Sequence, residues 1–237
     1  MGVLNEIWDD VVGIQSPPDR VETVLTGIGA LLLVTVPSLW RVTRNVVTIA
    51  HEGAHGVAAL VSGRRLAGIR VHSDTSGLTV SRGRPTGPGM VVTAAAGYLG
   101  PGLLGLGAAY LLSTHHAVGV LWAAVLLLAL LLLQIRNFYG LYAVLLAGIG
   151  VFAVSWWGNG QLQTLSAYTA TWFLLLAAPR PVLEMQGLRR VGRARSSDAD
   201  VLARLTHLPG LLWVGVFLLV NGSALVIGAG WLINASR

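Results

Sequence analysis

Two histidines and one glutamate lie within five consecutive residues of an otherwise apolar stretch: His51, Glu52 and His55. On a helix, positions four residues apart lie on one face, so both imidazoles could bind a single metal ion. The intervening Glu52 is displaced around the helix, yet it is near enough to contact a water molecule held by that ion. In this role a carboxylate takes the proton of the water during attack on a carbonyl and then passes it to the leaving amine. The pattern is typical of a zinc-dependent hydrolase.

The amino-acid composition narrows the metal chemistry. The chain has no cysteine, so it can form neither a disulfide nor a thiolate metal site. A transition metal must therefore be held by imidazole and carboxylate groups, which suits Zn²⁺. The alternative is a polar helix patch that binds nothing. That alternative is costly inside an apolar span, where two histidines and a glutamate would be buried without partners.

The rest of the sequence is that of a membrane protein. Hydrophobic residues make up 54% of the chain and charged residues only 11%, whereas soluble domains carry roughly a quarter charged residues. Apolar runs of about eighteen or more residues with almost no charge are candidate transmembrane helices. Seven runs can be read, at approximately 24–40, 42–62, 89–112, 117–135, 138–157, 162–178 and 210–233. We expect an all-α polytopic membrane protein with about six to seven transmembrane helices, forming a single membrane-embedded domain over residues 1–237.

The distribution of arginine predicts the orientation of these spans. If the N-terminus is cytoplasmic, most of the sixteen basic residues fall on that side, and only Arg41, Arg44 and Arg237 fall on the other. This asymmetry follows the positive-inside rule and favours an odd number of spans in the plasma membrane. It also explains the net charge of +6 without nucleic-acid binding. The expected cytoplasmic segments are the polar residues 1–23 and the loops 63–89 and 179–209.

Both loops contain signals of local structure. In the first, Ile69 and Val71 alternate with polar residues, as do Leu78 and Val80, and turn-forming residues 74–77 separate the two runs. This pattern predicts a small cytoplasmic β-hairpin. In the second loop, an arginine-rich stretch precedes a Ser-Asp-Ala-Asp sequence that is suited to capping a short amphipathic helix.

The segment from His51 to about Arg82 resembles the site-two protease family of intramembrane zinc metalloproteases. The resemblance rests on the His-Glu-x-x-His motif late in a span, on Gly63-Arg64-Arg65, and on the hairpin that follows. It continues more loosely into Ala94–Pro101, a stretch of small residues with Gly and Pro that would let helices approach the site closely. It implies a zinc endopeptidase that cleaves membrane-embedded segments of membrane-protein substrates within the lipid bilayer. It also implies that the hairpin could hold such a segment extended against an edge strand.

The sequence departs from that family at the third zinc ligand. Family members carry it as Asp in an Asp-Gly motif on a later helix, and this chain has no Asp-Gly. The Ser-Asp-Ala-Asp sequence resembles one in a divergent bacterial branch of these proteases, which makes Asp198 the expected ligand. Asp200, Asn137 and His207 are alternatives. Asn137 could instead bind substrate backbone or orient a ligand, and Asp198 could instead cap a helix.

A non-enzymatic membrane protein is the main alternative function: a metal-binding sensor, a transporter or a degenerate scaffold. Glu52 favours an enzyme, because metal binding alone does not require it. A transporter would be expected to show internal repeats, and none is convincing here. A membrane-anchored metallopeptidase for soluble substrates is a weaker third possibility. The remaining histidines, His72, His115 and His116, are expected to face solvent.

Overall fold

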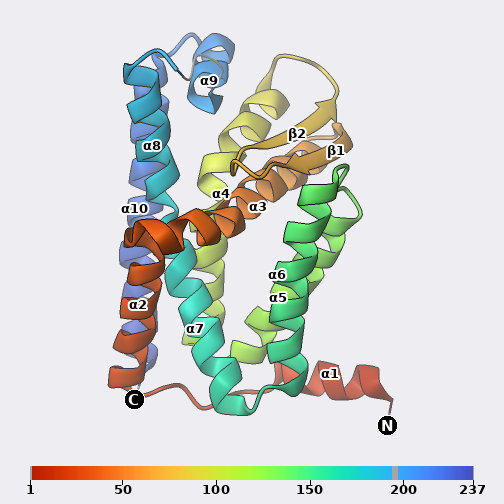
Figure 1. The fold of residues 1–237 in the computed structure, drawn as a ribbon, viewed down its shortest axis with the longest axis vertical. Helices are drawn as coiled ribbons and strands as arrows, with labels where there is room; N and C mark the ends of the chain where they lie inside the picture. The colour runs from red at the N-terminus through yellow and green to blue at the C-terminus, as the bar shows by residue number, and fades with distance from the viewer. Residues whose placement is uncertain (1, 194–196, 237) are drawn as a thin grey trace.

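The computed structural model of the chain describes residues 2–193 and 197–236. These residues form helices and one two-stranded sheet (Figure 1). The elements are α1 (Val3–Val12), α2 (Arg20–Thr35), α3 (Pro37–Val61), β1 (Arg65–Val71), β2 (Gly77–Arg82), α4 (Pro88–Ser113), α5 (Ala117–Leu132), α6 (Phe138–Trp157), α7 (Gly160–Ala177), α8 (Pro179–Arg190), α9 (Asp198–Thr206) and α10 (Gly210–Ala235). The expected fold, mostly helical with a small β-hairpin, is confirmed.

Several of the helices meet the requirements for crossing a membrane. Three of them, α4, α6 and α10, are long and apolar enough, and α2 with α3 qualifies as one bent pair. Helix α5 is apolar but has only 16 residues. The described residues therefore provide three to four candidate spans. The seven predicted runs do correspond to helices α2–α7 and α10, but the expected count of six to seven spans is not confirmed.

The bend of 97° between α2 and α3 follows from Pro37. Proline has no backbone N–H, so Pro37 cannot donate to the carbonyl of Leu33, and the chain leaves the helix there. Two side chains take over the carbonyls that are freed at this point. The Thr43 hydroxyl donates to Leu33 O at 3.0 Å, and the Arg180 guanidinium donates to Val34 O. The backbone carbonyls at the bend thus have hydrogen-bond donors, although the bend lies between the two ends of the bundle (Figure 1).

This bend changes the expected topology. Because α2 and α3 together cross the bundle once, α1 and the C-terminus lie at one end, and the hairpin and α9 lie at the other (Figure 1). Residues 1–23 therefore lie at the opposite end of the bundle from the hairpin and α9, so the expectation that they share a membrane side with the loops 63–89 and 179–209 is not confirmed. The expected topology treats α2 and α3 as two crossings, whereas the structure allows them to be one bent path.

The hairpin is antiparallel, and β1 lies between two neighbours. On one side β1 pairs with β2, from Arg65 opposite Arg82 to Val71 opposite Gly77. On the other side, Ile69 bonds to the segment that joins α5 to α6: its N–H donates to Gln134 O at 2.8 Å and its carbonyl accepts from Arg136 N at 2.9 Å. Among the described residues, the outer edge of β2 has no strand partner. Within the described residues, the outer edge of β2 is therefore open, whereas that of β1 is bonded at Ile69.

Candidate metal centre

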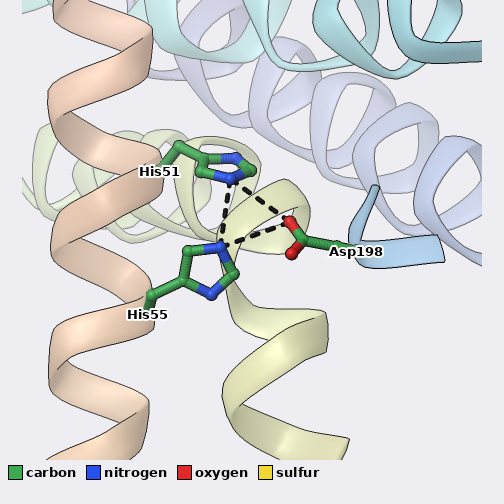
Figure 2. Close-up of side chains that lie close together, drawn as sticks. All are labelled: His51, His55 and Asp198. Atoms are coloured by element: carbon green, nitrogen blue, oxygen red, sulfur yellow. Dashed lines mark hydrogen bonds and ion pairs between the residues drawn. The ribbon is translucent and has the colours of Figure 1, made fainter. Parts of the chain in front are cut away.

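Three potential ligand atoms from two distant helices meet at one point. Helix α3 presents His51 and His55 one turn apart, and Asp198 is the first residue of α9 (Figure 2). The Nε2 atoms of the two histidines are 3.1 Å apart. The Oδ2 atom of Asp198 lies 3.3 Å from His51 Nε2 and 3.2 Å from His55 Nε2. The structure thus brings together the histidine pair and the aspartate expected from the sequence.

The dimensions of this triangle suit a zinc ion. In a tetrahedral site with bonds of about 2.0–2.1 Å, neighbouring ligand atoms are separated by about 3.3–3.4 Å. The three measured separations, 3.1, 3.2 and 3.3 Å, are close to that value. Two imidazoles with one carboxylate also form a ligand set found in zinc hydrolases, in which a fourth position stays open. The chemistry and the spacing of the donors therefore both fit the implied metal.

The surroundings of the histidines direct their Nε2 atoms into the triangle. The Nδ1 atom of His55 lies 2.7 Å from the carbonyl oxygen of Thr93 in α4. If Nδ1 carries the proton, it donates to that carbonyl and leaves Nε2 free to bind a metal. Gly97, one turn further along α4, faces the same atoms. A Cβ there would lie 2.6 Å from His51 Nε2 and 2.6 Å from His55 Cε1. Only glycine leaves room for the ligands at this position.

Glu52 is held in place by the hairpin. Its side chain is buried, with 4% of the residue exposed. The hydroxyl of Thr79 in β2 donates to Glu52 Oε2 at 2.6 Å and also lies 3.0 Å from the Glu52 carbonyl oxygen. Gly77 leaves space for the carboxylate, since a Cβ there would lie 2.6 Å from Glu52 Cδ. The hairpin therefore fixes the orientation of the carboxylate that is expected to act as base.

The apolar face of α9 delivers Asp198 to the histidines. Ala199 and Leu202 of this helix are fully buried against α4, α8 and α10, where they pack with Val182 and Phe217. Ser197 is the N-cap residue, so Asp198 occupies the first helical position instead of the cap. Helix packing, and not a local hydrogen bond, sets where this carboxylate lies.

The charge of Asp198 is suited to metal binding. Burial alone would raise the pKa of its carboxyl group, but hydrogen bonds from His51 and His55 hold it well below its ordinary value. The group is therefore ionised at neutral pH, as a metal ligand must be.

The neighbouring carboxylate has a different environment. Asp200 accepts from Arg189 of α8 at 2.7 Å and from the Ser197 hydroxyl at 2.6 Å. Burial tends to raise its pKa, but these hydrogen bonds lower it below the ordinary 3.8. Asp200 thus links α9 to α8 and does not belong to the ligand triangle.

The other candidate residues also lie outside the triangle. Both amide atoms of Asn137 bond to Val71 of β1: Nδ2 donates to its carbonyl at 2.6 Å and Oδ1 accepts from its N–H at 3.2 Å. Asn137 therefore fastens the hairpin and is no metal ligand here. His207 is exposed at the end of α9. His72 is exposed as expected, whereas His115 and His116 are only partly exposed.

A cleft of about 210 Å³ opens beside the cluster. Its lining includes His51, Glu52 and Gly77, with Tyr98 from α4 and Arg44 from the first half of α3. The Tyr98 ring stands edge-on to that of His51, with centroids 4.6 Å apart. His51 of the triangle and the buried Glu52 therefore adjoin one space that could receive a substrate.

Three residues of this site were not found from the sequence. Thr79 and Thr93 give no signal of their own, because a threonine in a strand or near a helix start is ordinary. Gly97 belongs to the small-residue stretch that predicts close helix approach, but the sequence does not tell which glycine faces the metal. These contacts depend on how α3, α4 and the hairpin pack.

Comparison with known proteins gives one result. The family described as Peptidase M50B-like matches residues 24–228, which is most of the chain. No curated protein and no solved structure matches.

Proposed function

We propose that this chain, which belongs to the Peptidase M50B-like family, is an intramembrane zinc endopeptidase. The membership and the apolar helices make it a membrane protein of a peptidase family. The observation that carries the finer proposal is the ligand triangle, one member of which, His51, lines the same cleft as the buried Glu52. A metal-binding sensor would need the triangle but not Glu52.

His51, His55 and Asp198 would hold the metal. When bound, zinc supplies acidification of a water molecule and polarisation of the substrate carbonyl. Glu52 accepts a proton from the water while the water oxygen forms a bond to the carbonyl carbon of the substrate. The C–N bond then breaks, and Glu52 returns the proton to the amine nitrogen. Thr79 keeps the Glu52 carboxylate aimed during both transfers, through its hydrogen bond to Oε2.

The open edge of β2 would hold the substrate extended. Gly77 and Thr79 lie at this edge next to Glu52, and Gly77 lines the cleft. A segment that pairs with β2 would be bound through its backbone and presented beside the carboxylate. A peptide must leave its helix before its backbone can be hydrolysed, so an edge strand at this place favours unwound segments. The substrate would be a segment of another membrane protein.

Two measurements on the purified protein test the proposal. Zinc content should be about one ion per chain, and His51→Ala and Asp198→Ala should lose it. The protein reconstituted with zinc should cleave single-span peptides that carry a fluorophore and a quencher at opposite ends. Glu52→Gln is the matched control, because it should keep the metal and lose cleavage. A wild type that holds zinc but cleaves none of a broad peptide panel would count against protease activity.

A further inference from the structure

Arg44 lies on the same face of α3 as His51, at the far end of the cleft. The two are seven positions apart in the sequence, so they are almost aligned around the helix and about 10 Å apart along it. Both residues line the cleft, and the side chain of Arg44 remains 37% exposed. Between them, the Thr48 hydroxyl donates to Thr75 O at 2.9 Å, so the hairpin turn follows α3 in the direction of Arg44.

The charges around Arg44 do not cancel. Its guanidinium pairs with Glu184 of α8 at 3.2 Å. Glu184 is shared, since Arg180 donates to it at 3.1 Å and the Trp40 indole donates at 3.0 Å. Within this cluster two guanidinium groups face one carboxylate, which leaves one excess positive charge. Arg180 makes two further contacts at the helix bend: its guanidinium donates a hydrogen bond to the Val34 carbonyl and lies over the Trp40 ring, 4.4 Å from the ring centroid. Arg44 is the cation that faces the cleft.

The metal end of the cleft offers nothing to balance this charge. The two carboxylates there, Glu52 and Asp198, match the charge of one divalent ion. The cluster lies near the bend, between the ends of the bundle (Figure 1), where an uncompensated charge is expensive. A cation at such a place that lines a binding cleft is suited to recognise an anion.

We propose that Arg44 forms a subsite for a carboxylate of the substrate, about three residues from the scissile bond. The spacing follows from the geometry, because about 10 Å along α3 corresponds to about three residues of extended chain. The carboxylate could be the side chain of Asp or Glu, or the free C-terminus of a short segment. This specificity rests on the proposed function and adds a preference that the metal site alone would not give.

Peptide binding to the Glu52→Gln protein tests this subsite without hydrolysis. The probes are pools of apolar peptides with blocked ends, identical except for one central Asp or Asn. A second pair of pools has no acidic residue and ends in either a free carboxylate or an amide. Immobilised zinc-loaded protein should retain the Asp pool about tenfold more than the Asn pool, as expected for a charge-assisted hydrogen bond. The second pair shows whether a terminal carboxylate is accepted instead.

Variants assign the preference to Arg44. Arg44→Gln should abolish it and Arg44→Lys should keep part of it, whereas Arg41→Gln, an exposed arginine outside the cleft lining, should leave it unchanged. Zinc content measured on each variant reports whether the fold is intact. If Arg44→Gln loses zinc, the test is repeated with the double variant Arg44→Gln/Glu184→Gln, which also removes the carboxylate that pairs with Arg44. Equal retention of carboxylate and amide pools by the parent, or a preference that survives loss of Arg44, overturns the subsite. Because binding needs no cleavage, these outcomes are independent of whether the protein is a protease.

Discussion

Replacing Gly97 by alanine should disable the metal centre while leaving the helix bundle folded. The added Cβ would lie 2.6 Å from both His51 Nε2 and His55 Cε1, and closer still to His55 Nε2. Ordinary contacts of this kind are about 3.5 Å, so the overlap is about 1 Å. Metal–ligand distances tolerate only about 0.2 Å. His55 cannot turn aside easily, because its Nδ1 is held by the Thr93 carbonyl at 2.7 Å.

The expected loss of zinc affinity is at least about 100-fold, since merely disturbing the partners of metal ligands costs roughly 10–100-fold. The assay is competition for zinc against a chelator of known affinity, with metal content measured after equilibration. Thermal unfolding of the metal-free protein, measured in parallel, reports the cost of the substitution to the fold itself.

Two other glycines of α4 provide matched controls. Gly107→Ala adds its Cβ in open space, with nothing within 4 Å, and should keep wild-type zinc affinity. Gly100→Ala adds its Cβ against that of Ala54, so it strains the same α3–α4 interface without touching a histidine. It should lower stability more than zinc affinity. If Gly97→Ala binds zinc as tightly as the wild type, the two Nε2 atoms are not metal ligands and the reasoning about the site is refuted.

Four further predictions follow from the contacts around the centre. Asp198→Asn should lose zinc, whereas Asp200→Asn should retain it in the same metal assay. Despite its burial, Asp200 has a lowered pKa because of the Arg189 hydrogen bond. The stability that its carboxylate contributes is therefore complete above about pH 3.8 and fades as the pH falls through the lower pKa of the folded state. Unfolding scans at acidic and neutral pH should show the Asp200→Asn protein converging on the wild type in acid. Thr79→Val should slow peptide cleavage about tenfold with zinc content unchanged, and Thr79→Ser should restore it. Asn137→Ala should speed hydrogen exchange of β1 without releasing zinc, and unchanged exchange would show that this amide does not fasten the hairpin.

The short-range parts of the site were predictable because they depend on local periodicity. His51, Glu52 and His55 share one helix, so their spacing alone puts both imidazoles on one face. The apolar runs that form α2–α7 and α10 are long enough to be recognised, and the alternation around Ile69 and Leu78 predicts the hairpin. None of these inferences requires knowing how one helix packs against another.

The path of the chain through the bundle was not predictable in the same way. A proline between two apolar runs is compatible with a loop between two spans or with a bend in one. Pro37 produces a bend because Thr43 and Arg180 supply donors to the carbonyls it frees. One of these donors comes from α8, which is remote in sequence. The end of the bundle at which residues 1–23 lie therefore depends on a tertiary contact.

The third ligand shows the same division. Asp198 and Asp200 are two residues apart on α9, about 200° around the helix, so only one of them can face the histidines. From the sequence, both are candidate third ligands, as are Asn137 and His207, and only a resemblance to a divergent branch of the family favours Asp198. Docking of the apolar face of α9 on α4, α8 and α10 turns Asp198 toward α3 and leaves Asp200 to Arg189. The sequence by itself thus determined the histidine pair and the glutamate beside it, because helical periodicity is a local property. Only the tertiary structure decided which carboxylate completes the cluster, because that depends on the packing of helices far apart in the chain.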